Sequence, residues 1–464
     1  MLFSSPVFFV FFVVYFIIHL VIPARWRLYL IIPGSTIFYA WWKLEYVWLP
    51  YLLMAIAYFG VIWMMDAKLE ASRKRRAGIV IALLFVPLVV FKYTNFMYND
   101  VLGALTGGGK VFDLTLPLGV SFVTFTLTAY IVDIYRGKFF ARARPQTVLA
   151  YVLFFPHLIA GPILRPNELI PQLEHPRSRK SLLPVAAVAV FTVGLVKKLV
   201  FADTIGELVD AVYAHAGTAT APEALLAMYG FSVQIYCDFS GYTDMAIGLA
   251  MLLGVRLPNN FAQPYCADSI VDFWRRWHKT LSFWLRDYLY ISLGGNRDGK
   301  VNEIRNVMIT MALGGLWHGA SWTFVIWGVL HGTAVSSVHS ARKLLHWSWL
   351  DQVPRWAAVL VTFHFVTLVW VFFRAPGLGD TTDILRAAAV GSWVGTQQFF
   401  NAHVFESLLM ALFFVLHRYD DHRRIRIAAA RLRPEILWPL LLAGWALAIT
   451  VSQGSSAKFI YFDF

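Results

Sequence analysis

The feature that most constrains this chain is the recurrence of apolar segments long enough to cross a lipid bilayer. A helix needs about 20 residues to span the hydrocarbon core, and such runs recur from 7–22 to 436–450. Hydrophobic residues make up 58% of the 464 positions and charged residues only 14%, whereas soluble domains carry about 25% charged residues. We therefore predict an all-α polytopic membrane protein with roughly ten to twelve helices.

The positive charge of the chain fits membrane topology better than nucleic-acid binding. The formal net charge is +13, but Lys and Arg lie in short loops instead of along one stripe. Basic loops follow the first run at Arg25 and Arg27 and recur at 66–76 and 136–144. Alternation of the helices then places the N-terminus outside, and the basic segment 417–433 before the last run places the C-terminus outside as well. The first run lacks a basic n-region and a cleavage site, so we expect it to stay as a helix.

The run 147–164 departs from this regular pattern. Pro156, Gly161 and Pro162 interrupt it, and it leads into another basic segment, 165–180, on the side where alternation expects none. Irregular backbone at membrane depth is tolerated only where protein or a water-filled cavity satisfies its polar groups. We predict a re-entrant or discontinuous segment at 150–166, and divide the chain into N-terminal helices (1–145), a catalytic core (146–340) and C-terminal helices (341–464).

His318 is the ionisable residue of greatest interest because it lies in an apolar run, in the sequence GGLWHGAS. Intramembrane ionisable residues are costly and often functional. Gly315 and Gly319 would let another backbone or a substrate approach closely, and a neutral imidazole could take a proton from a hydroxyl. A lone buried histidine is more often a structural hydrogen-bonding residue, but the polar and aromatic surroundings favour a catalytic role here. His331, farther along, is an ordinary helix histidine or a weak supporting candidate.

A second histidine, His278, ends the segment FWRRWH. On a helix, Trp274, Trp277 and His278 would share one face. An interfacial helix anchored by Trp and Arg explains the pattern equally well, and does not exclude a site on the same helix. Asp287 follows Arg286 and is expected to pair with an arginine of the cluster, in a structural role.

Polar residues also gather in YCDFSGYTDMAIG, at 236–248. Asp238, Ser240 and Tyr242 could offer oxygen ligands, but there are too few carboxylates for a calcium loop, so we expect no metal and assign the three to substrate binding. Hydrolase, zinc-protease, P-loop and dinucleotide-binding motifs are absent from the sequence. The two cysteines have no CxxC spacing and receive no role.

Taken together, these segments resemble the membrane-bound O-acyltransferase (MBOAT) superfamily, and within it the bacterial membrane subunits that O-acetylate alginate. The likeness covers nearly the full length, although Thr126 stands where such proteins often carry Gln or Glu. The segments that carry it are FYAWW (38–42), FKYTNF (91–96), PLGVSF (117–122), YIVDIYRG (130–137), FFPHLIAGPILR (154–165), GLVKKLVFAD (194–203), DFSGYTDMAIG (238–248), the segment 272–297, GGLWHG (314–319) and FIYFDF (459–464).

The resemblance implies a ring of tilted and re-entrant helices around a central tunnel in the bacterial inner membrane. It also implies that His318 is the essential histidine of a Trp-His-Gly motif, that His278 is the family's second histidine, and that Trp317 and Trp277 beside them contact substrate. The expected reaction moves an acetyl group from cytoplasmic acetyl-CoA, a donor substrate and not a resident cofactor, to an exported, alginate-like polysaccharide. Arg275, Arg276 or Lys279 would bind donor phosphates, with Lys197 and Lys198 as weaker candidates.

The expected partners are a separate periplasmic acetyltransferase of the SGNH type, proteins of polysaccharide synthesis and export, and membrane lipid. Transfer is direct or passes through that periplasmic partner. Two other functions stay open: a transporter or flippase, favoured by the broken helix, and transfer of D-alanyl or another acyl group to an envelope polymer. Alginate, cellulose and peptidoglycan all remain open as acceptors.

Overall fold

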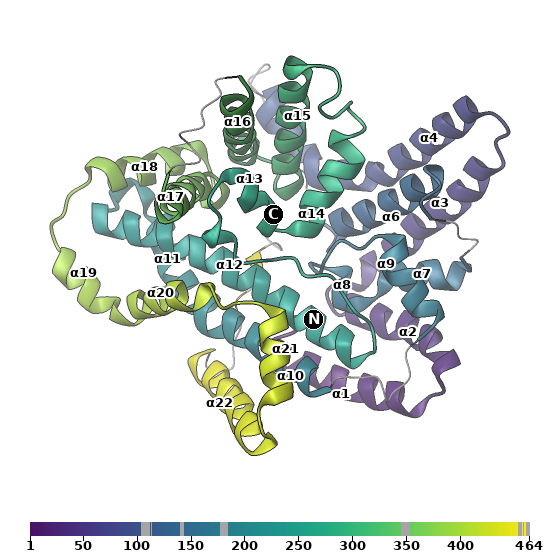
Figure 1. Cartoon of the computed structure of the whole chain (residues 1–464), viewed down its shortest axis with the longest axis horizontal. Helices are drawn as coiled ribbons and strands as arrows, with labels where there is room; N and C mark the ends of the chain where they lie inside the picture. The colour runs from purple at the N-terminus through teal and green to yellow at the C-terminus, as the bar shows by residue number, and fades with distance from the viewer. Residues whose placement is uncertain are drawn as a thin grey trace. The chain divides into compact units, whose positions relative to one another are not determined.

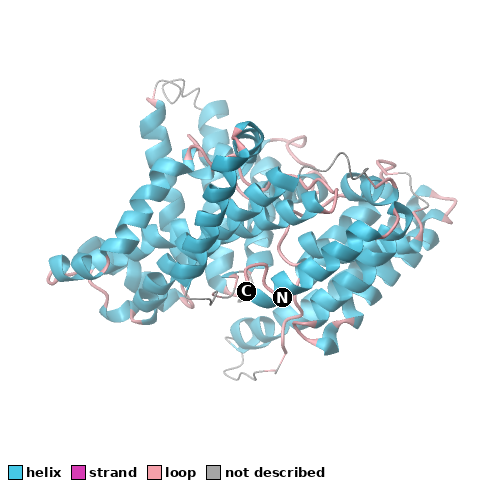
Figure 2. Ribbon diagram, turned by 90° about the horizontal axis from the view of Figure 1, so that it is seen from below, coloured by secondary structure: helices cyan, strands magenta, loops and turns pink. Residues whose placement is uncertain are grey.

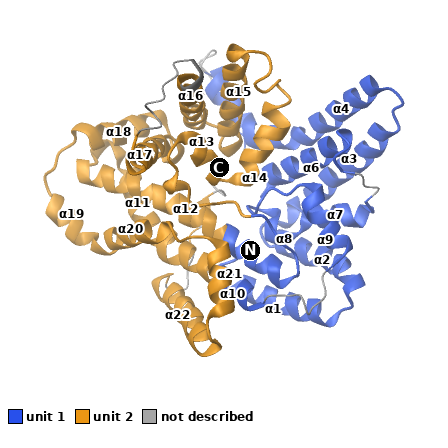
Figure 3. Ribbon diagram, viewed as in Figure 1, with its two compact units in different colours: residues 1–191, 243–258 blue, residues 192–242, 259–464 orange. Residues whose placement is uncertain are grey.

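The computed structural model describes residues 1–103, 112, 114–139, 143–176, 184–344, 353–452, 457, 459 and 460. Within these residues the chain forms helices and loops without any strand (Figure 2), which confirms the all-α prediction. The chain divides into two compact units: residues 1–191 with 243–258, and residues 192–242 with 259–464 (Figure 3). These units follow packing, whereas the three segments 1–145, 146–340 and 341–464 stay a prediction.

Unit 1 contains the N-terminal helices, which Figure 1 colours purple to blue. Helices α3, α4 and α6 pack against one another, and α2 packs against α7 and α8. The helices of this unit are α1 (Pro6–Val21), α2 (Arg27–Ala40), α3 (Trp48–Met65), α4 (Glu70–Leu88), α6 (Val120–Tyr135), α7 (Pro145–Leu153), α8 (Phe155–Leu158) and α9 (Pro166–Glu174). Thr124, Thr126 and Thr128 are buried in α6.

The predicted discontinuous segment is confirmed in unit 1. Helix α7 ends at Leu153, the short α8 ends at Leu158, and the chain then runs without regular structure to α9. Side chains satisfy the polar backbone that this break exposes: the Tyr151 hydroxyl donates to the Leu164 carbonyl oxygen at 2.7 Å, and the Phe155 N–H donates to Ser35 Oγ at 3.2 Å. His157 Nε2 lies 2.8 Å from the Tyr151 carbonyl oxygen.

Unit 2 holds the candidate site residues. The boundary between the units falls inside α10 (Pro184–Val196) and α12 (Ala221–Leu252), and a π-helical turn at Lys197–Asp203 continues α10. The other helices of unit 2 are α11 (Thr204–Ala214), α13 (Ile270–Arg276), α14 (Lys279–Trp284), α15 (Lys300–His318), α16 (Trp322–Leu344), α17 (Arg355–Arg374), α18 (Leu378–Val390), α19 (Thr396–Ala402), α20 (Val404–His417), α21 (His422–Arg431) and α22 (Pro434–Ser452).

Helix α12 is continuous through Gly241, the glycine of the DFSGYTD segment. A methyl group at Gly241 would lie 2.7 Å from the Gly194 carbonyl oxygen and 3.1 Å from Lys197 Cβ. The glycine therefore allows close packing of α12 on the α10 segment instead of bending the helix.

By length and composition, five helical segments in the described part of the chain can cross a membrane. A sixth span results if α19 and α20, which meet at 76°, are counted together. This is fewer than the ten to twelve helices that the hydropathy predicts, because other apolar segments are short, such as α1 and α6, or broken. The five are Leu44–Met65, Glu70–Tyr93, Pro184–Ala214, Arg355–Arg374 and Pro434–Ser452.

Candidate acyl-transfer site

His318 is the last residue of α15, which forms a tight helical hairpin with α16. A methyl group at Gly315 would overlap the carbonyl oxygen of Phe324, and one at Gly328 would overlap that of Met311. The glycines around His318 were expected to allow another backbone or a substrate to approach closely. In the structure, the backbone of α16 makes this approach. This contact fixes the end of α15 and hence the position of the histidine.

The His318 side chain is buried, with 3% of its surface exposed. Its ring centroid lies 5.0 Å from that of Trp317, 5.2 Å from Trp327 and 5.2 Å from Phe373 of α17. Edge-to-face contacts at such distances are typical of packed aromatic rings. His318 is therefore held by aromatic groups from three helices.

His278 lies at a sharp change of chain direction and not on a helix. Helix α13 ends at Arg276, Trp277 is extended, and His278 has a φ of 39°, in the left-handed region that non-glycine residues rarely occupy. The prediction that Trp274, Trp277 and His278 share one helical face is therefore wrong. Asn260 holds the turn: its carbonyl oxygen accepts from the Lys279 N–H at 2.9 Å, and its Oδ1 accepts from the Thr280 N–H at 3.2 Å.

This turn points the fully buried His278 ring into the interior of unit 2. Its centroid lies 4.7 Å from Phe239 of α12 and 6.2 Å from Trp317. Trp317 thus lies between His278 and His318, and the structure brings these three predicted site residues together. Trp277 points elsewhere: it stacks on Phe273 at 5.7 Å and contacts Trp370 at 5.0 Å.

His331, only a weak candidate from its sequence context, is a third buried histidine in the same region. Its ring centroid lies 4.8 Å from Trp327 and 5.1 Å from Trp274. The sequence signal that could have revealed this position is spacing, because His331 follows Trp327 by one helical turn on α16. We call His278, His318 and His331, with Trp274, Trp317 and Trp327, the histidine cluster.

Asp238, Ser240 and Tyr242 lie on α12 and are all buried. Asp238 Oδ1 lies 2.8 Å from Lys198 Nζ, and its Oδ2 accepts from the Ile460 N–H at 2.7 Å. Tyr242 contacts the ring of Phe459 at 4.7 Å. Asp238 and Tyr242 therefore contact the C-terminal segment, of which 461–464 lie outside the described residues. No group of three or more metal-ligating side chains occurs in the described part of the chain.

Lys197 and Lys198, the weaker candidates for donor phosphates, are both held in ion pairs. Lys197 Nζ lies 2.5 Å from Asp420 Oδ2, and Lys198 Nζ lies 2.8 Å from both Asp203 and Asp238. A buried ammonium needs such partners. These lysines therefore stabilise the fold, and the structure does not support phosphate binding by either.

The two arginines of FWRRWH have different surroundings. Arg276 is held by Asp272, with Nε 2.7 Å from Oδ2, so it belongs to the packing of α13. Arg275 is exposed and borders a groove of about 330 Å³ with Trp274, Phe283 and Arg286. Asp287 pairs with the adjacent Arg286 at 2.7 Å, so this buried carboxylate has an arginine partner, as expected.

Comparison with known proteins identifies the family of this chain. The sequence model of the membrane-bound O-acyltransferase family matches residues 143–375, which include both His278 and His318. The chain is 39% identical to a probable alginate O-acetylase AlgI of Azotobacter vinelandii, over 85% of this chain and 79% of that protein. It is 40% identical to the corresponding protein of Pseudomonas aeruginosa, over 85% and 76% of the two chains.

A relative with another named substrate is also similar. The peptidoglycan O-acetyltransferase of Helicobacter pylori is 35% identical over 83% of this chain and 79% of that protein. A teichoic acid D-alanyltransferase of Bacillus subtilis is 28% identical over 55% of this chain. The chain belongs to the membrane-bound O-acyltransferase family and is an O-acyltransferase of this multi-pass membrane type.

Proposed function

We propose that this protein transfers an acetyl group from acetyl-CoA to a hydroxyl for the O-acetylation of an exported polysaccharide, with His318 as the general base. The observation that carries the proposal is the burial of His318 in the histidine cluster, inside the region that matches the family. The named activities of the relatives that align over most of the chain support acetyl as the acyl group. The D-alanyltransferases, which align over a shorter part with lower identity, make D-alanyl transfer the second candidate.

In the proposed reaction, His318 accepts the proton of the acceptor hydroxyl while the oxygen attacks the thioester carbonyl. The carbon–sulfur bond then breaks, and the proton passes from the imidazole to the departing coenzyme A thiolate. The rings of Trp317, Trp327 and Phe373 exclude water from the imidazole, which protects the thioester from hydrolysis. His278 lies across Trp317 and is proposed to orient the acceptor or donor.

The groove beside α13 and α15 is the proposed donor site. It combines apolar side chains with Arg275 and Arg286 at its rim, a composition suited to a pantetheine chain that ends in phosphates. Its wall residue Trp274 contacts Trp327 at 5.7 Å, and Trp327 contacts His318. A donor in the groove would therefore be separated from the proposed base by two aromatic side chains, Trp274 and Trp327. Arg276, already paired with Asp272, is not proposed to bind the phosphates.

We further propose that the protein acts in the bacterial inner membrane with both termini in the periplasm. The donor thioester is cytoplasmic and an exported polymer is outside, so the acetyl group has to cross the bilayer without the bulky, anionic coenzyme A. A periplasmic SGNH-type acetyltransferase, acting with proteins of polymer synthesis and export, is the proposed partner for any transfer that does not occur directly.

The test is a membrane assay that follows radiolabelled acetyl from acetyl-CoA to polymer. His318→Ala should lower acetyl transfer at least about 100-fold, since general base catalysis contributes about 10²–10⁴ in rate. The matched control is His215→Ala, at an exposed histidine of unit 2 whose Nδ1 lies 3.2 Å from the Ala211 carbonyl oxygen of its own helix, and it should keep normal activity.

Two results would overturn the proposal. Undiminished transfer by a well-inserted His318→Ala protein would remove His318 from the mechanism. Substrate flux without consumption of acetyl-CoA by the unaltered protein would point to a transporter, and labelling from a D-alanyl carrier protein but not from acetyl-CoA would establish the second candidate.

A further inference from the structure

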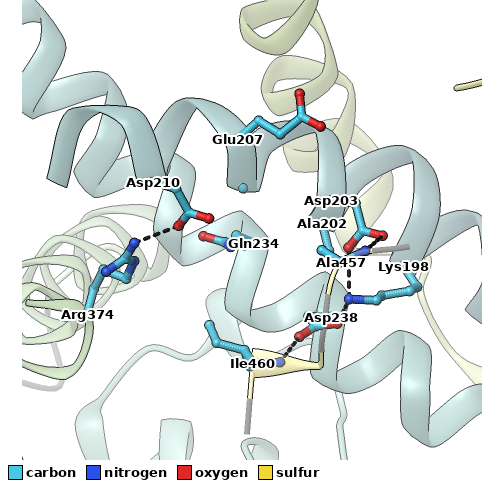
Figure 4. A pocket seen from close by; sticks show the side chains of 11 residues that line it. Lys198, Ala202, Asp203, Glu207, Asp210, Gln234, Asp238, Arg374, Ala457 and Ile460 are labelled. Carbon is cyan, nitrogen blue, oxygen red and sulfur yellow. Dashed lines mark hydrogen bonds and ion pairs between the residues drawn. The ribbon is translucent and has the colours of Figure 1, made fainter. Parts of the chain in front are cut away.

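Unit 2 contains a polar cavity that the proposed reaction has not used. It has a volume of about 430 Å³ and lies between α11, α12, the π-helical turn before α11 and the end of α17 (Figure 4). We call it the charged cavity. Its charged and amide-bearing lining residues are Lys198, Asp203, Glu207, Asp210, Gln234, Asp238 and Arg374.

The charged cavity is closed at one end and open at the other. The side chains of Lys198 and Asp238 are each 3% exposed, whereas that of Asp210 is 63% exposed, and Glu207 is exposed as well. The C-terminal segment closes the inner end, since Ala457 donates to Asp203 Oδ2 at 3.2 Å and Ile460 donates to Asp238 Oδ2 at 2.7 Å. A volume of several hundred cubic ångströms is typical of small-ligand sites.

Both cations of the lining are engaged by carboxylates of the lining. Lys198 Nζ lies 2.8 Å from Asp203 Oδ1 and from Asp238 Oδ1, and Arg374 donates to Asp210 Oδ1 at 2.6 Å. Four carboxylates thus face two cations, so an anionic ligand would meet an excess of like charge. The charges of the lining therefore disfavour an anionic ligand.

The remaining polar groups suit a ligand that carries hydroxyls. The amide of Gln234 can both donate and accept, and the carboxylate of Glu207 accepts from hydroxyl groups. Gly206 leaves room for this amide, since a methyl group there would lie 2.7 Å from Gln234 Nε2. In Figure 4 Gln234 lies between the Arg374–Asp210 pair and Lys198.

Residues that line the cavity are adjacent in sequence to residues that contact the histidine cluster, on two helices. On α17, Phe373 contacts His318 and the next residue, Arg374, lines the cavity. On α12, Phe239 contacts His278 and the preceding residue, Asp238, lines the cavity. The cavity and the aromatic surroundings of both histidines therefore share the same stretches of α12 and α17.

We propose that the charged cavity binds the acyl acceptor, and that this acceptor is an uncharged, hydroxyl-bearing saccharide instead of a uronate. The inference rests on the proposed function, because it takes the cavity ligand to be the acceptor. It narrows that function by excluding an anionic polymer as the group bound in the cavity.

The experiment measures binding alone, on the full chain purified in lipid nanodiscs. Titration calorimetry compares three oligosaccharides of five residues: an uncharged β-glucan, an anionic polymannuronate and a cationic polyglucosamine. We expect the uncharged oligomer to bind most tightly and the anionic oligomer not to bind. Glu207→Gln, at the exposed mouth, and Gln234→Leu should each weaken that binding about tenfold, the effect of losing one or two good hydrogen bonds. The matched control is Asp383→Asn, which removes an exposed carboxylate of α18 away from the cavity lining.

Several results would overturn the inference: tighter binding of either charged oligomer, binding of none of the three, or an unchanged affinity in Gln234→Leu. Acetyl-CoA turnover is measured on the same samples to separate the two proposals. Turnover that depends on His318 without saccharide binding removes the inference and keeps the proposed function. Binding of the uncharged oligomer without any turnover removes the proposed function, and with it the assignment of the bound saccharide as the acceptor.

Discussion

The histidine cluster and the charged cavity both border α12 and α17 but are built from opposite kinds of side chain. In the cluster, His278 and His318 are surrounded by aromatic rings, and each is placed by backbone features, the Asn260-held turn and the Gly315 contact. In the cavity, Lys198 and Arg374 are placed by ion pairs. One region thus holds imidazole rings by packing and backbone geometry, while the other holds its charges by pairing them.

Among substitutions in these two regions, we expect the largest effect from one at Lys198, which should lower the stability of the protein. Lys198→Met removes the cation that lies 2.8 Å from both Asp203 and Asp238, and leaves buried carboxylates without it. Removing one partner of a buried ion pair costs about 3–5 kcal/mol. Thermal unfolding in detergent should show this loss, and Lys198→Met combined with Asp238→Asn should be more stable than Lys198→Met alone. A loss of stability below about 1 kcal/mol, the range of surface ion pairs, would contradict the assignment of Lys198 to a buried ion-pair network.

Much of the fold was readable from the sequence, for reasons that these regions illustrate. Apolar composition and length predict helices, and Pro156 with Gly161 predicts the break after α7, because these residues act locally on the backbone. His318 could also be selected as a candidate site residue, since an ionisable residue between glycines in an apolar run is unusual. The count of full spans was not predicted, because hydropathy does not reveal that α1 and α6 are short or that α19 and α20 meet at an angle.

The arrangement within the site depended on contacts distant in sequence, which a pattern of residue types does not encode. The turn at His278 is held by Asn260, eighteen residues earlier, so helical periodicity gave the wrong face. Lys198, in the π-helical turn after α10, pairs with Asp238 of α12, and His331 of α16 contacts Trp274 of α13. Local rules predicted the elements, whereas tertiary packing decided which polar side chains were already paired.

The next largest effect is expected on catalysis, from substitutions of His278 in its left-handed turn. His278→Asn should keep the fold, because Asn tolerates the left-handed backbone conformation, but should lower acetyl transfer about 100-fold if the ring takes part in the reaction. His278→Ala should lose the same activity and a further ~1 kcal/mol of stability from backbone strain. The acetyl-transfer assay and thermal unfolding separate these terms. Normal transfer by His278→Asn would reduce His278 to a packing residue.

A smaller effect is expected in the proposed donor groove. Arg275→Ala should raise the KM for acetyl-CoA about tenfold, the equivalent of one charge-assisted contact with phosphate, with little change in thermal stability because Arg275 is exposed. Arg276→Ala is the matched comparison: it should destabilise the protein through loss of the Asp272 pair and leave this KM nearly unchanged. Steady-state kinetics over a range of acetyl-CoA concentrations test both, and equal KM values for the two variants would remove Arg275 from the donor site.

The smallest effect is expected at His331, the third histidine of the cluster. Its ring is stacked on Phe273, with centroids 6.1 Å apart and planes inclined by 6°, and lies edge-on to Trp274. His331→Phe preserves an aromatic ring of similar size, so acetyl transfer should stay within about threefold of normal and stability within about 1 kcal/mol, the range of well-fitted core replacements. Measured beside His278→Asn, this variant tells whether proton-exchanging groups extend through the whole cluster. A 100-fold loss of acetyl transfer with unchanged stability would show that His331 takes part in the reaction. All three histidines of the cluster would then be functional, in contrast to the paired charges of the cavity.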